Sequence, residues 1–201
     1  MNSESIPEYK IILASNSSIR QKILEDSGIS FEVVPSEVEE EELKQSFSSN
    51  NSREYCLALA KAKALDVSNK KKNAYVIGSD QICCYGEEIF SKPLTKENCF
   101  KTLSKLSGNT HYQNCGISIC KNGKEIWSHY AQAALTMKSL SDTEIRDYID
   151  KDEPFMACGA YRFESLGKDL FLTTKGDETT IQGLTLNPII NFLTSKKVIN
   201  L

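Results

Sequence analysis

Short apolar runs alternate with helix-type patterns along most of this chain. Residues 9–14, YKIILA, predict a strand, and a polar turn separates it from a helix whose Ile19 and Ile23 fall on one face before Gly28 ends it. A second strand is predicted over 29–38, where Pro35 interrupts it. The order of strand, turn, helix and strand favours an α/β fold.

The same alternation continues to the end of the chain. Asn51 with Glu54 predicts the start of a helix that reaches about Leu65, followed by a polar loop over 68–73. The apolar run at 74–78 predicts a buried strand that ends at Ser79 and Asp80. Five further elements are expected: a helix over 96–106 capped by Thr95, a hairpin around Asn122-Gly123, a helix opened by Ser141 and reaching Ile149, a strand over 170–174, and a last helix that begins at Asn187-Pro188.

Composition and charge narrow the class of protein. With 201 residues and 40% apolar content the chain can bury a core as one domain over residues 1–201, so a disordered protein is excluded. The net charge of -3 gives no overall positive field, and we expect no nucleic-acid partner. No stretch approaches the roughly 20 apolar residues that cross a bilayer, and no targeting pattern is recognised, so we expect a cytoplasmic protein without a membrane partner. The seven cysteines lack zinc-site spacing and are predicted to be reduced core residues.

Two short segments carry candidate chemistry. Asp80 interrupts a strand that should be buried, where an ionised side chain needs a partner. It could hold a water or a metal ion, or it could cap the following turn. The serine-rich turn that precedes Arg20 could bind phosphate at the positive end of a helix, or it could be an ordinary helix cap.

Charged residues elsewhere extend this picture. Glu40 lies in a run of four glutamates and could be a Mg²⁺ ligand, although such a run is often only solvated. Lys61 and Lys63 point to nearly opposite faces of a helix, so only one can face a cleft. Lys92 precedes Pro93, which could fix its direction, but it could also be a surface lysine. The mixture of hydroxyls, cations and carboxylates suits a polyphosphate with its Mg²⁺ ion.

Eight segments together resemble the Maf family of nucleoside triphosphate pyrophosphatases over nearly the whole chain: LASNSSIR, SEVEEE, ALAKAKA, GSDQ, SKPL, LSGNTHYQNCG, CGAYRFESLG and IQGLTL. The resemblance implies a mixed, twisted α/β sheet with flanking helices and a deep cleft that could divide the domain into two lobes, similar to the inosine triphosphate pyrophosphatases. It also implies a nucleoside triphosphate substrate and a divalent cation, Mg²⁺ or Mn²⁺, and leaves a homodimer open. GSDQ and the loop that contains Glu164 are similar to the branch that acts on 7-methyl-GTP.

Site residues are carried over by motif. The resemblance implies that Asp80 accepts a proton or binds the metal ion and that Glu40 helps to bind that ion. The residues that would hold the triphosphate are Ser15, Ser17, Arg20, Lys63 and Lys92, and those associated with substrate choice are Ile19, Gln81 and Glu164. The chain departs from the family pattern at Ile19, at Cys115 in place of threonine, and at Thr185 in place of proline.

Three functions remain open. The leading hypothesis is hydrolysis of 7-methyl-GTP to 7-methyl-GMP and pyrophosphate, a housekeeping activity against modified nucleotides. The alternatives are the same reaction on dTTP or UTP, and a regulator of cell division at the septum that only binds nucleotide. In the first case Glu164 is expected to accept two guanine N–H bonds, whereas in the simpler alternative it pairs with Arg162 or caps the loop before Gly167.

Overall fold

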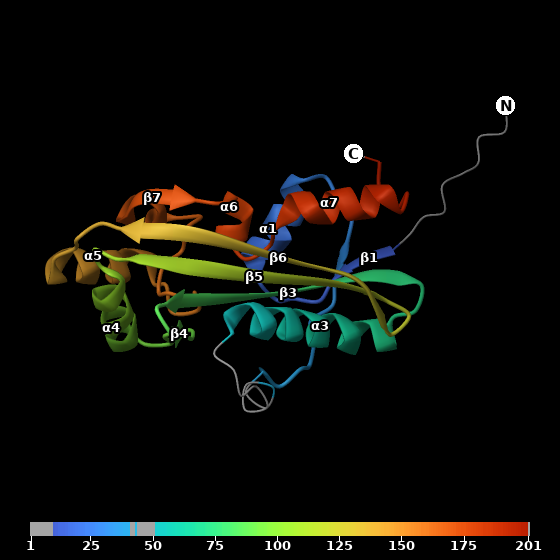
Figure 1. Ribbon diagram of the computed structural model, residues 1–201, viewed down its shortest axis with the longest axis horizontal. Coiled ribbons are helices and arrows are strands. Elements are labelled where there is room, and N and C mark those ends of the chain that lie inside the picture. The colour runs from blue at the N-terminus through green and yellow to red at the C-terminus, as the bar shows by residue number, and fades with distance from the viewer. Residues whose placement is uncertain (1–9, 41–42, 44–50, 201) are drawn as a thin grey trace.

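The computed structural model describes residues 10–40, 43 and 51–200 (Figure 1). Its strands are β1 (Lys10–Leu13), β2 (Glu32–Val33), β3 (Ala74–Tyr85), β4 (Glu88–Phe90), β5 (Thr110–Lys121), β6 (Lys124–Met137) and β7 (Phe171–Lys175). Its helices are α1 (Ser18–Asp26), α3 (Ser52–Lys70), α4 (Lys96–Leu106), α5 (Asp142–Asp152), the short 3₁₀ helix η1 (Leu166–Leu170), α6 (Glu178–Ile181) and α7 (Leu186–Ser195).

The strands form one mixed seven-stranded sheet in the order β2-β1-β3-β5-β6-β7, with β4 also paired to β3. β1 is parallel to β2 and β3, and the remaining pairs are antiparallel. The long strands β3, β5 and β6 run along the molecule, with α3 on one face and α1, α6 and α7 on the other (Figure 1). The predicted α/β fold with a mixed sheet and flanking helices is confirmed.

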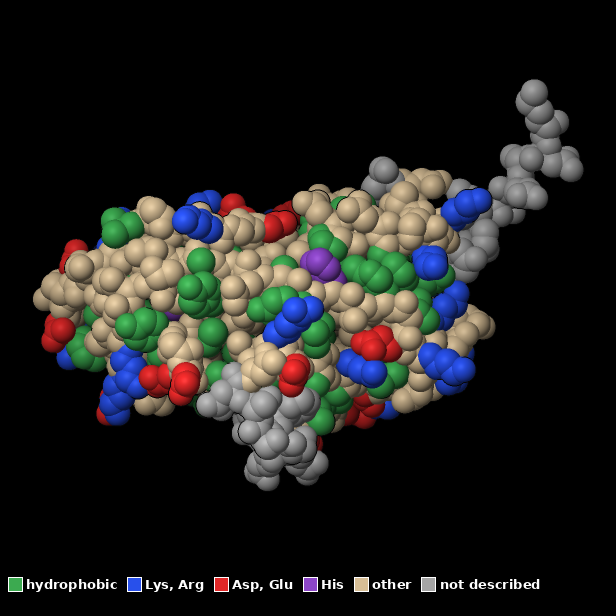
Figure 2. Space-filling model, in the orientation of Figure 1, with side chains coloured by type: hydrophobic (Ala, Val, Ile, Leu, Met, Phe, Trp, Pro, Cys, Tyr) green, Lys and Arg blue, Asp and Glu red, His purple; other side chains and the backbone are tan. Residues whose placement is uncertain are grey.

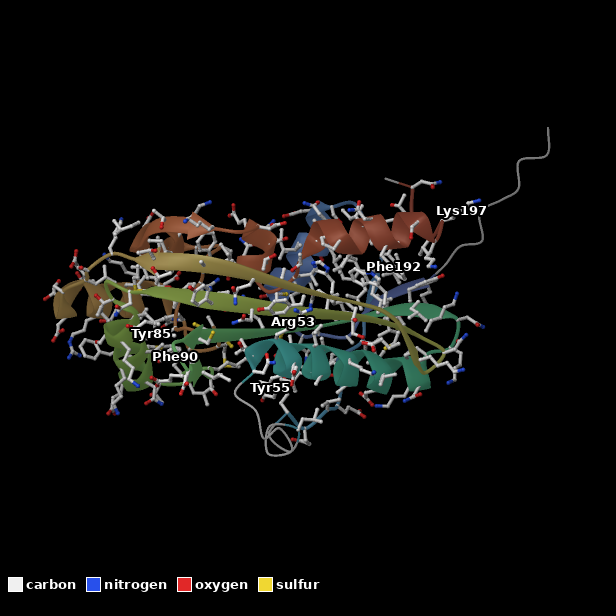
Figure 3. All side chains as sticks on the ribbon, viewed as in Figure 1. Arg53, Tyr55, Tyr85, Phe90, Phe192 and Lys197 are labelled. Carbon is white, nitrogen blue, oxygen red and sulfur yellow. The ribbon has the colours of Figure 1, made fainter. Side chains whose placement is uncertain are left out.

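Strand alternation divides the core between these two faces. On β3, Tyr75 and Ile77 pack in a cluster with residues of α1 and α7, whereas Val76 packs in a second cluster with residues of α3. Phe192 of α7 points toward the sheet, where its ring stacks on Trp127 of β6 at 5.1 Å (Figure 3). Both faces of β3 are therefore buried, which explains its continuous apolar run.

Several elements match their sequence signals. Asn122 and Gly123 have φ of 52° and 75°, as the two-residue hairpin turn requires. Ser141 and Glu144 form the predicted capping box of α5. Thr95 accepts the backbone N–H of Asn98 at the start of α4. All seven cysteines are free, and all except the half-buried Cys158 are buried.

Other boundaries were predicted wrongly. The strand expected to end at Asp80 continues to Tyr85, because β5 pairs with it from Val76 to Cys84. Helix α3 continues past Leu65 to Lys70, since residues such as Val67 are buried against the sheet. The strand expected over 29–38 is two residues long, α5 runs on to Asp152, and α7 begins at Leu186.

Among the described residues, no helix has both the length and the apolar character that a membrane crossing requires. Positive and negative side chains are interspersed on the face that Figure 2 shows.

Candidate active site

The candidate site begins at an interruption in the edge of the sheet. β1 pairs with β3 only as far as Ile77, and β4 pairs with β3 only from Cys83 onward. β5 occupies the other side of β3, so β1 and β4 share one edge. Within the described part of the chain, the edge formed by residues 78–82 has no strand beside it, and we call this segment the notch.

The alternation of side chains along β3 sends the motif GSDQ to both faces. Asp80 faces α3 and contacts Lys63. Ser79 and Gln81 face the other side, where they bond to carbonyl oxygens of the segment around α6. The notch therefore presents a carboxylate on one face and two neutral polar side chains on the other.

Two glycines allow α3 to lie directly on the sheet. A Cβ atom on Gly78 would lie 2.1 Å from the carbonyl oxygen of Ala60, and one on Gly116 would lie 2.5 Å from that of Cys56. No real Cβ atom tolerates such distances, so a larger residue at either position would force the helix away. This close approach brings Lys63 of α3 to Asp80.

Lys63 lies between two carboxylates. Its ammonium nitrogen is 2.6 Å from Asp80 Oδ1 and 2.9 Å from Glu40 Oε1. Lys63 and Asp80 are buried, whereas Glu40 is half-exposed. Burial raises the pKa of Asp80 above its ordinary value, although the nearby Lys63 and Arg20 cations oppose the rise. A carboxylate with a raised pKa is a better proton acceptor near neutral pH.

The same pair of carboxylates fits a divalent cation. Mg²⁺ in nucleotide sites is commonly held by one or two carboxylates together with substrate phosphates and water, and Glu40 and Asp80 are two such ligands beside one polar edge. Among the described residues, no group of three or more Asp, Glu, His or Cys side chains gathers at one point, so phosphate and water oxygens would complete the coordination.

Arg20 joins three segments at the notch. Its Nε donates to the carbonyl oxygen of Gly183 at 2.8 Å, and its Nη1 donates to that of Ser79 at 2.9 Å. Ser15 Oγ accepts both Arg20 Nη1, at 3.3 Å, and the backbone N–H of Ser17, at 3.2 Å. The Ser15 hydroxyl therefore keeps its own proton for a further acceptor. Ser17 precedes α1 without a capping bond from its side chain.

Lys92 approaches the site from the loop after β4. It is exposed and lines a pocket of about 250 Å³ with Phe90, Pro93 and Asn98. The Cys158 thiol lies 3.6 Å from the carbonyl oxygen of Gln81, and the positive charge of Lys92 affects the pKa of this thiol. Burial and then Asp80 raise the pKa of Cys158 to about 11, and the Lys92 cation opposes this. Lys92 therefore lies near enough to Cys158 for its charge to act there, and its contact with a triphosphate stays a prediction.

Lys61 points away from these groups. Its ammonium nitrogen pairs with Glu125 of β6 at 2.9 Å, and this partner raises the pKa of Lys61. The prediction that only one of the two α3 lysines can face the site is confirmed.

A second pocket, of about 260 Å³, adjoins the notch on the face opposite Asp80. Ile19, Glu164 and Gln182 are among its lining residues. Ile19 precedes Arg20 and Gln182 precedes Gly183, so the pocket lies next to the bond between those two residues. Two of the residues expected to govern substrate choice, Ile19 and Glu164, are therefore brought together. Glu164 also pairs with Arg162 at 3.4 Å.

Gln81 is not among the lining residues of that pocket. Its amide nitrogen donates to the carbonyl oxygens of Ile181, at 2.5 Å, and Thr180, at 3.3 Å. The side chain expected to help select the substrate is thus bonded to α6.

The two buried departures from the family pattern contact each other. Burial raises the pKa of the Cys115 thiol, while hydrogen bonds with Thr185 and Ser79 lower it. Thr185 also lies 3.0 Å from Thr180, oxygen to oxygen. The segment between α6 and α7 therefore rests on Cys115 of the sheet.

Sequence reasoning missed several members of this arrangement. Ser79 donates to the Gly183 carbonyl oxygen at 2.7 Å, which makes that oxygen a shared acceptor for Ser79 and Arg20. Gly183, Ser79 and Gly78 all lie in quoted motifs, so the motifs marked them without indicating their contacts. Gln182 lies in such a motif too, but nothing in the sequence showed that it lines a pocket.

The geometry by itself defines a class of site: cations and hydroxyls suited to a polyanion lie beside paired carboxylates. The family model described as Maf-like protein matches residues 10–196, and the chain belongs to this family. It is 40% identical over 199 residues to "Nucleoside triphosphate pyrophosphatase" of Legionella pneumophila (strain Corby), covering 99% of this chain and 100% of the relative.

A second relative carries a more specific name. The chain is 36% identical over 195 residues to "7-methyl-GTP pyrophosphatase" of Brucella abortus biovar 1 (strain 9-941), covering 95% of this chain and 98% of the relative. Among solved structures, the Staphylococcus aureus Ham1 protein has a TM-score of 0.48 at 16% identity, covering 93% of this chain and 99% of that one.

Proposed function

We propose that this chain hydrolyses 7-methyl-GTP to 7-methyl-GMP and pyrophosphate. The coarser statement, that it is a nucleoside triphosphate pyrophosphatase, is the enzyme class predicted from the sequence and rests on the curated relatives that cover almost the whole chain. The observation that carries the hydrolysis of a triphosphate is the buried ammonium group of Lys63 between Glu40 and Asp80, beside the turn that contains Ser15 and Arg20. The choice of base rests on the pocket that Glu164 lines.

The groups at the notch suit a triphosphate. Arg20 of α1, Lys63 of α3 and Lys92 of the loop after β4 supply positive charge, and the Ser15 hydroxyl has a proton to donate. Placed around the leaving pyrophosphate, these groups stabilise the negative charge that develops on it as the bond breaks. A divalent cation held by Glu40, and by Asp80 where that carboxylate is a ligand and not the base, would supply further positive charge and would acidify a water.

The chemistry requires a proton acceptor next to the attacking water. The water oxygen forms a bond to the α-phosphorus, the bond from that phosphorus to the bridging oxygen breaks, and pyrophosphate leaves. The proton of the water goes to the carboxylate of Asp80, whose burial raises its pKa and so strengthens it as a base. Lys63 holds the carboxylate in place.

The pocket beside α1 suits a positively charged base. Its lining includes the carboxylates of Asp26, Glu164 and Glu178 and the ammonium groups of Lys22 and Lys168. Lys22 pairs with Asp26 at 3.0 Å and Lys168 with Glu178 at 3.1 Å, so no lysine of the pocket pairs with Glu164. Methylation at N7 adds positive charge to guanine, and this strengthens its attraction to a carboxylate.

The test is pyrophosphate release from 7-methyl-GTP, GTP, UTP and dTTP with Mg²⁺ or Mn²⁺, by the wild type and the Glu164→Gln variant. We expect 7-methyl-GTP to have the highest kcat/KM and Glu164→Gln to lower this value more than that for UTP, by about 10- to 150-fold. Arg162→Met is the matched control, because it removes the protein partner of Glu164 but keeps the carboxylate. Equal losses for 7-methyl-GTP and UTP, or the same phenotype in both variants, would contradict the role of Glu164.

A further inference from the structure

We propose that Gln182, and not Gln81, is the amide side chain that contacts the nucleobase, and that Gln81 is a positioning residue that holds α6. This inference rests on the proposed function, because it assigns the pocket of Ile19 and Glu164 to the base. It adds a contact that the motifs do not indicate and replaces the expected role of Gln81.

Gln81 has its amide group committed to the protein. Its Nε2 donates to two successive carbonyl oxygens at the end of α6, those of Thr180 and Ile181. A Cβ atom on Gly183 would lie 3.1 Å from Gln81 Oε1, so the other end of the amide packs against the same segment. To bond a base, Gln81 would have to break its hydrogen bonds to these carbonyl oxygens. Because α6 is only four residues long, these bonds are important for holding the helix in place.

Gln182 is placed differently. It is the residue that follows α6, its side chain is half-buried, and it lines the pocket with Ile19 and Glu164. Among the described residues, its side-chain amide has no hydrogen-bond partner, whereas the backbone N–H of Gln182 is bonded to Glu178. The side-chain amide of Gln182 is therefore available to a ligand, while the backbone of Gln182 is held by its bond to Glu178.

Two of the polar side chains that line this pocket, those of Glu164 and Gln182, complement a 6-oxopurine. The Glu164 carboxylate can accept N1–H and the 2-amino group, and the Gln182 amide can donate to O6 on the same edge of the base. Adenine presents an amino group at this position, an acceptor at N1 and no 2-amino group. The Gln182 amide would have to turn over to accept from that amino group, and Glu164 would be left without a proton to accept. Such unpaired polar groups are the strongest source of discrimination between similar substrates.

Gln81 acts on this contact through α6. Its two bonds fix the carbonyl oxygens directly before Gln182, so losing them would let Gln182 move within the pocket. Two consequences distinguish positioning from direct contact. Removing the Gln81 amide should lower thermal stability, and it should alter base preference only while Gln182 is present.

The experiment is a double-mutant cycle with Gln182→Leu, Gln81→Leu and the double variant, measuring kcat/KM for 7-methyl-GTP and for ATP together with thermal midpoints. We expect Gln182→Leu to lower kcat/KM for 7-methyl-GTP by about 5- to 30-fold, mainly through KM, with little change for ATP and an unchanged midpoint. Gln81→Leu should lower the midpoint and part of the preference for 7-methyl-GTP. In the Gln182→Leu background it should change that preference no further.

Two outcomes would overturn the inference: an unchanged preference in Gln182→Leu, or a loss of preference from Gln81→Leu that is the same with and without Gln182. Calorimetric binding of 7-methyl-GMP by the same variants separates this failure from failure of the proposed function. A wild type that releases no pyrophosphate would contradict the function, while binding of the monophosphate would still show which glutamine contacts the base.

Discussion

Gly78→Ala should separate α3 from the strand that carries Asp80. The new Cβ atom would lie 2.1 Å from the carbonyl oxygen of Ala60, 2.8 Å from the backbone nitrogen of Ala64 and 2.9 Å from its Cβ. Ordinary contact begins at 3.4 Å, so the helix must withdraw by about 1.3 Å. Two of the three atoms are backbone and cannot rotate away.

The free energy of unfolding and the activity should both fall. Overpacking typically lowers the free energy of unfolding by about 1–3 kcal/mol, and contact with helix backbone puts this variant at the upper end, about 3 kcal/mol. Lys63 lies between Ala60 and Ala64, so the shift also lengthens its 2.6 Å contact with Asp80. A displacement of about 1 Å can lower turnover by about 100-fold.

The assay combines urea unfolding with pyrophosphate release, both at a temperature where each variant is folded. Gly86→Ala is the matched control, since no heavy atom lies within 4 Å of its new Cβ and only its φ of 60° opposes the change. That backbone strain should lower the free energy of unfolding by about 1–2 kcal/mol and leave turnover unchanged. A Gly78→Ala protein within about 0.5 kcal/mol of wild type, or with full turnover, would refute the close approach of α3.

Two other substitutions test the charges around the notch. Burial raises the pKa of Asp80, so the acid limb of the profile of kcat/KM against pH should lie above the ordinary carboxyl range. The negative charge of Glu40 also raises this pKa, so Glu40→Gln should move the limb to lower pH. A limb that moves to higher pH would contradict this reasoning. Lys92→Ala should raise KM and lower kcat together in steady-state measurements, because charge on pyrophosphate grows in the transition state, and an unchanged kcat/KM would leave Lys92 as a surface residue.

Local signals predicted the parts of the fold that depend on neighbouring residues. The turn at Asn122-Gly123 and the capping box at Ser141 depend on backbone groups within a few residues, so the sequence contains their cause. The end of β3 does not have such a cause. Just past Asp80 the strand pairs with Cys115 and Asn114 of β5, more than thirty residues on, and no local pattern indicates that pairing. Its last three residues also pair with β4, in a short hairpin that the sequence analysis did not predict.

The candidate site shows the same division. The sequence motifs alone assigned Asp80, Lys63 and Arg20 to one site, because residue types suited to phosphate chemistry recur in ordered segments. Which groups touch each other was not predictable, since Gln81 looks like a neighbour of Asp80 in sequence but points to the opposite face. The strand alternation that separates them applies only because β3 continues through both residues, and the sequence did not predict that continuation.

The most direct test of the account is the rate of pyrophosphate release by Asp80→Asn at saturating 7-methyl-GTP with Mg²⁺ or Mn²⁺. The carboxamide has nearly the same shape as the carboxylate but cannot accept the proton of the attacking water. We predict that the variant folds and largely keeps its affinity for nucleotide while its turnover falls by about 100-fold or more. Turnover close to that of the wild type would contradict the assignment of the chemistry to Asp80.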